Sequence, residues 1–113
     1  MYEDFEKLLE PLNAKKEVRV FADHVGAGKG LRQRLKESGF KDYRFDYQVQ
    51  DILIEIQGYG FSHQGKGQQR DWQKNNDAVK LGYRVLYFPA DMAKKTPHVI
   101  IDEIKECLET DSQ

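Results

Sequence analysis

The spacing of hydrophobic and polar residues predicts four helices along the chain. Apolar residues recur at helical spacing in four segments: residues 2–12, residues 30–38, residues 68–81 and a last segment that opens at Thr96-Pro97. Gly39 and Gly82 follow the second and third segments, and glycine is the residue type that most often ends a helix. In the third segment Trp72, Asn76 and Val79 share one face, which we expect to pack in the core.

A period of two predicts strands in the middle of the chain. Apolar and polar residues alternate over residues 43–49 and again over residues 52–57, which indicates two neighbouring strands. Residues 83–88 read as a further strand, and residues 17–22 as a short strand or an irregular segment. The apolar face of the central pair collects Phe45, Tyr47, Val49, Ile52, Ile54 and Ile56. The order of these elements predicts a mixed β-sheet flanked by α-helices, which is an α/β fold.

Composition limits the class of protein further. The 113 residues suit one domain, over residues 1–113, and 39% hydrophobic residues suffice for a core. No apolar run approaches the roughly 20 residues that span a bilayer, so we expect no membrane contact. The first residues are acidic and amphipathic, unlike a signal peptide, and Cys107 is the only cysteine. These features favour a cytoplasmic protein.

The distribution of charge allows a nucleic-acid partner although the net charge is −1. Basic residues concentrate in one stretch of the chain, whereas acids concentrate near both ends. A local basic surface can hold a phosphate backbone with salt-dependent affinity, and a solvated helix face would explain the same residues. The candidate phosphate-binding residues are Lys29, Arg32, Arg34, Lys36 and Arg44.

Two acidic residues lie on the central strands. A two-residue turn at Gln50-Asp51 would place Asp46 opposite Glu55, with Cβ atoms about 5 Å apart and Gln57 on the same face. Gln-Asp is a poor turn dipeptide, so a four-residue loop is also open. Two close carboxylates repel each other until one takes a proton or both bind a cation, and Mg²⁺ prefers such oxygen ligands. Half-buried acids neutralised by Arg44 or a lysine would fit the same pattern.

Several short motifs follow one another over residues 43–88. They are Arg44-Phe45-Asp46-Tyr47, Ile54-Glu55-Ile56-Gln57-Gly58, His63-Gln64-Gly65-Lys66-Gly67, Asp71-Trp72-Gln73-Lys74-Asn75-Asn76-Asp77-Ala78 and Leu81-Gly82-Tyr83-Arg84-Val85-Leu86. In order and spacing they resemble the PD-(D/E)XK nuclease superfamily. The best match is to small phage and bacterial endonucleases related to very-short-patch-repair and VRR-type nucleases. The resemblance implies a restriction-endonuclease-like fold.

The resemblance also implies site residues. Asp46, Glu55 and the main-chain carbonyl of Ile56 would hold Mg²⁺, with Mn²⁺ as a substitute. The family's usual third residue is lysine, where this chain has Gln57, which could still position a water by hydrogen bonding. The role of that lysine could pass to metal-bound hydroxide or to another side chain, and the candidates are His63, Lys66 and Lys74.

Two of these assignments have ordinary alternatives. Lys74 could equally form a surface ion pair with Asp71, three residues earlier on the same helix. Many relatives supply a further acid from the first helix, and Glu6 is the nearest candidate here. A solvated acid on a helix surface is the alternative for Glu6.

The expected function is therefore a metal-dependent endodeoxyribonuclease that hydrolyses phosphodiester bonds and leaves 5′-phosphates. Residues 24–44 would contact DNA, and RNA stays open as a substrate. So small a chain would reach both strands more easily as a homodimer, which suits junction resolution in DNA repair or recombination, while a monomeric nickase is equally open. The alternative is a nucleic-acid-binding protein on the same fold with a weak or inactive site, since Gln57 departs from the family pattern.

Overall fold

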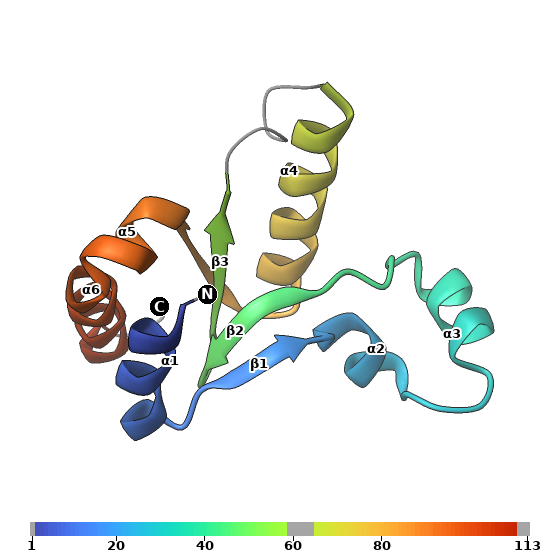
Figure 1. The fold of residues 1–113 in the computed structure, drawn as a ribbon. Helices are drawn as coiled ribbons and strands as arrows, with labels where there is room; N and C mark the ends of the chain where they lie inside the picture. Colours follow the sequence, from blue (N-terminus) through green and yellow to red (C-terminus); the bar gives the residue numbers. More distant parts are fainter. Residues whose placement is uncertain (1, 59–64, 111–113) are drawn as a thin grey trace.

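A four-stranded mixed sheet lies at the centre of the protein, with helices on both of its faces (Figure 1). The computed structural model describes residues 2–58 and 65–110, without the side chains of residues 65–71. The spatial strand order follows the chain: β1 (Lys15–Val18), β2 (Phe45–Val49), β3 (Ile52–Gln57) and β4 (Arg84–Pro89). The first three strands pair antiparallel, and β4 runs parallel to β3.

The helices divide between the two faces of the sheet. Their bounds are α1 (Glu3–Leu9) with the 3-10 turn η1 (Glu10–Leu12), α2 (Val20–Val25), α3 (Leu31–Ser38), α4 (Gly65–Lys80), α5 (Ala90–Lys95) and α6 (Pro97–Glu109). One core cluster joins α1, α5 and α6 to Tyr47, Ile52 and Ile54 of the sheet. A second cluster joins α2, α3 and α4 to Phe45 and Leu53. The predicted mixed sheet flanked by helices is confirmed.

The central hairpin has the shorter of the two loops that the sequence allowed. Its pairs run from Val49–Ile52 to Tyr47–Ile54, so Gln50 and Asp51 form a two-residue turn. Gln50 adopts a positive φ of 53°, an uncommon conformation for a residue other than glycine. The Gln48 side-chain amide donates a hydrogen bond of 2.8 Å to the Gln50 carbonyl. This contact stabilises a turn that its residue types do not favour.

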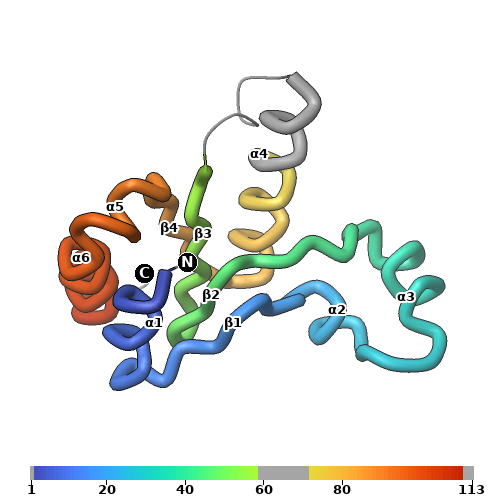
Figure 2. Tube along the Cα trace, viewed as in Figure 1, coloured from blue at the N-terminus to red at the C-terminus, as the bar shows by residue number. Residues whose placement is uncertain are grey.

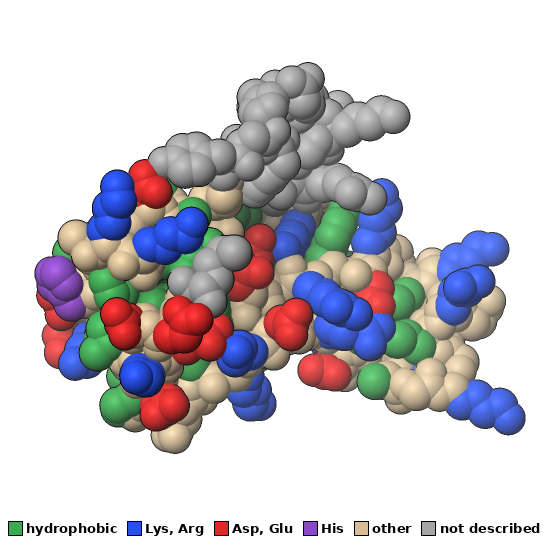
Figure 3. Space-filling model, in the orientation of Figure 1, with side chains coloured by type: hydrophobic (Ala, Val, Ile, Leu, Met, Phe, Trp, Pro, Cys, Tyr) green, Lys and Arg blue, Asp and Glu red, His purple; other side chains and the backbone are tan. Residues whose placement is uncertain are grey.

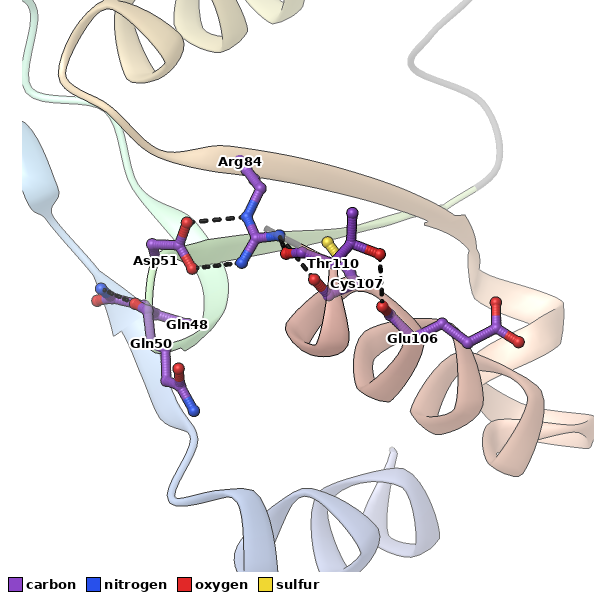
Figure 4. Close-up of polar contacts among 7 residues, drawn as sticks. All are labelled: Gln48, Gln50, Asp51, Arg84, Glu106, Cys107 and Thr110. Carbon is purple, nitrogen blue, oxygen red and sulfur yellow. Dashed lines mark hydrogen bonds and ion pairs between the residues drawn. The ribbon is translucent and has the colours of Figure 1, made fainter. Parts of the chain in front are cut away.

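Arg84 connects the hairpin turn to the end of α6 (Figure 4). Its guanidinium donates two hydrogen bonds of 2.8 Å to the two carboxylate oxygens of Asp51. It also donates to the main-chain carbonyls of Cys107, at 2.6 Å, and Thr110, at 3.0 Å. The last carbonyls of a helix have no partner within the helix, so Arg84 satisfies groups that would otherwise need water.

Most predicted helices are found near their expected bounds. The predicted helix over residues 2–12 becomes α1 and η1, and α6 begins at Pro97 as the Thr96-Pro97 pair indicated. α3 ends at Ser38, and Gly39 after it has a φ of 84°, a conformation that a side chain would strain. The short helix α5 was not predicted.

Three expectations are wrong. The strand predicted over residues 17–22 is instead β1, which ends at Val18, followed by α2; the buried run of Val20, Phe21 and Ala22 fits a helix that packs inward and not an alternating strand. Phe45 and Tyr47 were expected on one face, but Phe45 packs in the core on the side of α2 and α4, and Tyr47 packs on the other side. The third error concerns α4.

The predicted apolar face of α4 is exposed. Trp72 and Val79 are 53% and 56% accessible, because α4 turns Asp77 and Ala78 toward the sheet instead. Helical spacing predicted that Trp72 and Val79 share a face, but not which face the sheet would cover.

α2 and α3 form an arm at the end of the molecule remote from α5 and α6 (Figure 2). We call residues 20–44 the basic arm. Its interior contains the Phe21 ring, which lies 5.4 Å from the Phe40 ring and 5.9 Å from the Tyr43 ring between centroids. Arg19 donates two hydrogen bonds to the Asp42 carboxylate and so joins the two ends of the arm. No helix in the described ranges is long and apolar enough to cross a membrane.

Candidate functional site

Asp46 and Glu55 meet where the pairing of β2 and β3 ends. One residue beyond the last pair, the Asp46 main-chain N–H donates to Glu55 Oε1 at 3.0 Å, and the Ile56 N–H donates to Asp46 Oδ2 at 2.8 Å. Both carboxylates thus accept main-chain hydrogen bonds from the opposite strand. The predicted opposition of Asp46 and Glu55 in the hairpin register is confirmed by these contacts.

The two residues that flank Asp46 on β2 do not follow the alternation of a regular strand. Tyr47 packs on the α1 side of the sheet and Phe45 on the α4 side, whereas a regular strand would place both on one face. Asp46 lines a cavity on the α1 side, while Glu55 is contacted by Lys74 from the α4 side. The prediction that the two acids share one face of the sheet is therefore wrong.

Lys74 of α4 is the basic partner of Glu55. Its ammonium lies 2.9 Å from Glu55 Oε2 and 4.4 Å from the centre of the Phe45 ring. The Lys74 and Glu55 side chains are only 12% and 16% exposed. The structure therefore brings Lys74 to the paired acids. Lys74 was one of the residues proposed to take the role of the lysine that Gln57 replaces. A lysine partner was equally part of the view that these acids are structural.

Burial raises the pKa of Glu55 above its ordinary value. The hydrogen bond and charge of Lys74 lower that pKa, and the nearby charge of Asp46 raises it again. The rise remains after these opposing effects, so burial disfavours the Glu55 carboxylate more than Lys74 stabilises it. Either a proton or a further cation would stabilise such a carboxylate.

On the α1 side, Asp46 lines a cavity of about 440 Å³ together with Tyr2, Glu6, Lys16, Glu17, Tyr47 and Ile56. The Tyr47 hydroxyl donates a hydrogen bond of 2.7 Å to Glu6 Oε2, and the Lys16 ammonium lies 3.0 Å from Glu6 Oε1. The hydrogen bond from Tyr47, followed by that from Lys16, lowers the pKa of Glu6. Burial and the Glu6 hydrogen bond raise the pKa of Tyr47 well above its ordinary value. The first-helix acid thus lies in the cavity that Asp46 lines.

The remaining predicted site residues are placed as follows. Ile56 follows Glu55 on β3 and lines the same cavity as Asp46. Gln57 ends β3 and is half-buried, in register with Pro89 of β4. His63 and the side chain of Lys66 lie outside the described residues.

The oxygen donors present suit a hard divalent cation. Two carboxylates and a main-chain carbonyl would supply the few protein ligands that Mg²⁺ takes while it keeps several waters. In the described part of the chain, no group of three or more His, Cys, Asp or Glu side chains is arranged to hold a metal ion. By residue type, Asp46, Glu55 and the Ile56 carbonyl would supply three oxygen ligands, and Lys74 competes for Glu55.

The predicted phosphate-binding residues lie on the basic arm and at its junction with β2. Figure 3 shows Lys and Arg side chains gathered at the end of the molecule that carries α3. Four are exposed, namely Lys29, Arg32, Lys36 and Arg44. Arg34 differs, because its Nε donates a hydrogen bond of 3.0 Å to the Gly26 carbonyl and so supports the loop before α3. The arm also carries a cavity of about 570 Å³, rimmed by Arg32, Lys36 and Lys41.

Sequence reasoning missed Lys16 and the Tyr47 hydroxyl. Lys16 escaped because the first strand was predicted two residues too late, which left it outside any element. Tyr47 was counted only as an apolar residue, and only the fold brings its hydroxyl to Glu6. No family model, curated protein or solved structure matches this chain.

Proposed function

We propose that this protein is a metal-dependent endodeoxyribonuclease that hydrolyses phosphodiester bonds at the Asp46–Glu55 junction. The observation that carries the proposal is the pair of reciprocal hydrogen bonds that bring both carboxylates into the gap between β2 and β3. Burial keeps the Glu55 pKa raised even beside Lys74, and a metal ion would stabilise this carboxylate. The resemblance of residues 43–88 to PD-(D/E)XK nucleases adds to this reasoning.

Each residue has a defined part in the proposed reaction. Asp46, Glu55 and the Ile56 carbonyl would hold Mg²⁺ or Mn²⁺, which supplies an activated water and offsets charge on the phosphate. Lys74 is the cation that Gln57 does not provide, and its ammonium is close enough to Glu55 to orient a water or transfer a proton. Gln57 would hold the attacking water by a hydrogen bond.

The basic arm would bind the DNA backbone. Arg44 immediately precedes β2, so the exposed cations of the arm continue along the chain to within two residues of Asp46. Phosphate contacts of this kind position the duplex without reading its sequence. Cutting as a homodimer at branched DNA and nicking as a monomer both remain consistent with this arrangement, and RNA stays open as a substrate.

One observation favours a second candidate function. The Lys74 ammonium already occupies Glu55 Oε2 in a largely buried ion pair. If that pair is permanent, Glu55 cannot bind a metal, and the protein would bind nucleic acid without cutting it.

Cleavage assays separate the two candidates. Supercoiled plasmid, four-way-junction DNA and an RNA hairpin are incubated with Mg²⁺, with Mn²⁺ and with chelator. We expect metal-dependent cutting that chelator, Asp46→Ala and Glu55→Ala each abolish, while Asp102→Ala on the exposed surface of α6 serves as the matched control. Binding without metal-stimulated cutting would favour the second candidate, and the absence of both would refute the two together.

A further inference from the structure

The cavity that Asp46 lines has an unusual balance of charge. Glu6, Glu17 and Asp46 contribute three carboxylates, and Lys16 is the one cation among the described residues that line it. Carboxylates repel a phosphodiester, so a nucleic-acid strand that approaches Asp46 from this side needs a positive group to hold it. Lys16 is the residue in place to do so.

Lys16 is held loosely compared with the other lysine near the acids. Its side chain is 59% exposed, and its one described ion pair is with Glu6, at 3.0 Å. An exposed pair of this kind contributes little stability, so Lys16 can exchange Glu6 for a phosphate at small cost. Lys74, in contrast, lies in a largely buried pair beneath the Phe45 ring.

The sheet fixes the position from which Lys16 acts. β1 pairs with β2 so that Lys16 lies opposite Tyr47, one residue from Asp46. Lys15 lies opposite Gln48 and points to the other face by the alternation of a strand. The two neighbouring lysines therefore share strand, charge and exposure, but only Lys16 lines the cavity.

We propose that Lys16 is a substrate-binding residue that holds a backbone phosphate of the nucleic-acid strand in the cavity beside Asp46. This inference rests on the proposed nuclease function and extends it, because it assigns the α1 side of the sheet as the side on which the cut strand lies. Glu6 keeps the ammonium in the cavity until a phosphate replaces it.

The test compares Lys16→Ala with Lys15→Ala and Lys16→Arg on the DNA form that the wild type binds. Binding is measured in chelator over a series of salt concentrations, and cleavage is measured with Mg²⁺. We expect Lys16→Ala to lower kcat/KM about tenfold to a hundredfold, the effect of losing one charge-assisted hydrogen bond. It should also reduce the slope of log K against log salt by about 0.9, the value for one phosphate contact on duplex DNA. Lys16→Arg should keep most of the wild-type kcat/KM and most of the salt slope.

The Glu6→Gln variant separates phosphate binding from a merely structural role. If Lys16 only positions Glu6, both Lys16→Ala and Glu6→Gln lower cleavage and neither changes the salt slope, which would overturn the inference. If the wild type cuts DNA and Lys16→Ala binds and cuts it as Lys15→Ala does, the inference is also overturned, while the proposed function stays intact. A wild type that neither binds nor cuts would refute the proposed function, and the role of Lys16 with it. Thermal unfolding of every variant checks that the fold is kept.

Discussion

Lys74 should contribute strongly to stability because it neutralises a largely buried carboxylate. Replacing it by methionine keeps an unbranched side chain on α4 but removes the ammonium 2.9 Å from Glu55 Oε2. Glu55 would then keep the Asp46 N–H as its described donor, beside the charge of Asp46. Breaking a fully buried pair costs about 3–5 kcal/mol, and a charge-assisted hydrogen bond contributes about 1.5–3 kcal/mol.

Because the Lys74 and Glu55 side chains keep some exposure to solvent, we expect the loss of stability to be smaller than for a fully buried ion pair. Glu55 can also take up a proton once Lys74 is gone, which limits the penalty further. We therefore expect Lys74→Met to lower the free energy of unfolding by about 2–3 kcal/mol, including about 0.5–1 kcal/mol for the lost contact with the Phe45 ring. For a domain of this size that corresponds to a fall in Tm of about 8–12 °C.

Urea and thermal unfolding measure this change directly. Lys80→Met is the matched control, because Lys80 lies on the same helix and is 67% exposed. Its buried partner Asp77 keeps a hydrogen bond of 3.0 Å from the Gln73 side-chain amide. We expect the effect of Lys80→Met to stay within about 0.5 kcal/mol. Glu55→Gln combined with Lys74→Met should recover at least half of the loss, since no carboxylate then remains unpaired. A Lys74→Met variant as stable as Lys80→Met would refute the electrostatic reasoning.

Three further changes test other parts of the structure. Arg84→Ala should lower the free energy of unfolding by about 2–3 kcal/mol, because it removes four hydrogen bonds between the hairpin turn and α6. The Arg84 hydrogen bond lowers the Asp51 pKa, so its stabilisation of the fold is complete above the ordinary value of 3.8 and is lost as pH falls through the lowered value. Urea unfolding at a series of pH values measures this loss of stability in acid, and Asp51→Asn should reduce it. Arg32→Glu with Lys36→Glu should weaken DNA binding and reduce its salt dependence, measured by fluorescence anisotropy, whereas Lys105→Glu on α6 should not.

The central hairpin could be predicted because its signals are local. Alternation over residues 43–49 and 52–57 specifies two strands, and an even loop keeps Asp46 opposite Glu55 whichever turn forms. The departure came at Phe45, which packs on the side of the sheet opposite to Tyr47. The side on which Phe45 packs depends on its contacts with α2 and α4, and a two-residue period contains no information about them.

The candidate site needed tertiary contacts that spacing cannot supply. Lys74 was one of two lysines named as candidates for the cation that Gln57 does not provide, and only the packing of α4 on the sheet brings it to Glu55. Lys16 reaches the acids through the pairing of β1 with β2, between residues more than thirty positions apart in the chain. The face of α4 was mispredicted for a related reason, since helical spacing groups Trp72 with Val79 but leaves open which face is covered.

The central claim is that Asp46 and Glu55 together hold one divalent cation. Anomalous diffraction from a crystal soaked in Mn²⁺ tests it most directly, because it locates the ion without requiring a substrate. We expect one peak between the two carboxylates and the Ile56 carbonyl, with the Lys74 ammonium displaced from Glu55, and no such peak in Asp46→Ala crystals. The account would be contradicted if crystals soaked in Mn²⁺ showed no ion at this junction and an unchanged Lys74–Glu55 pair.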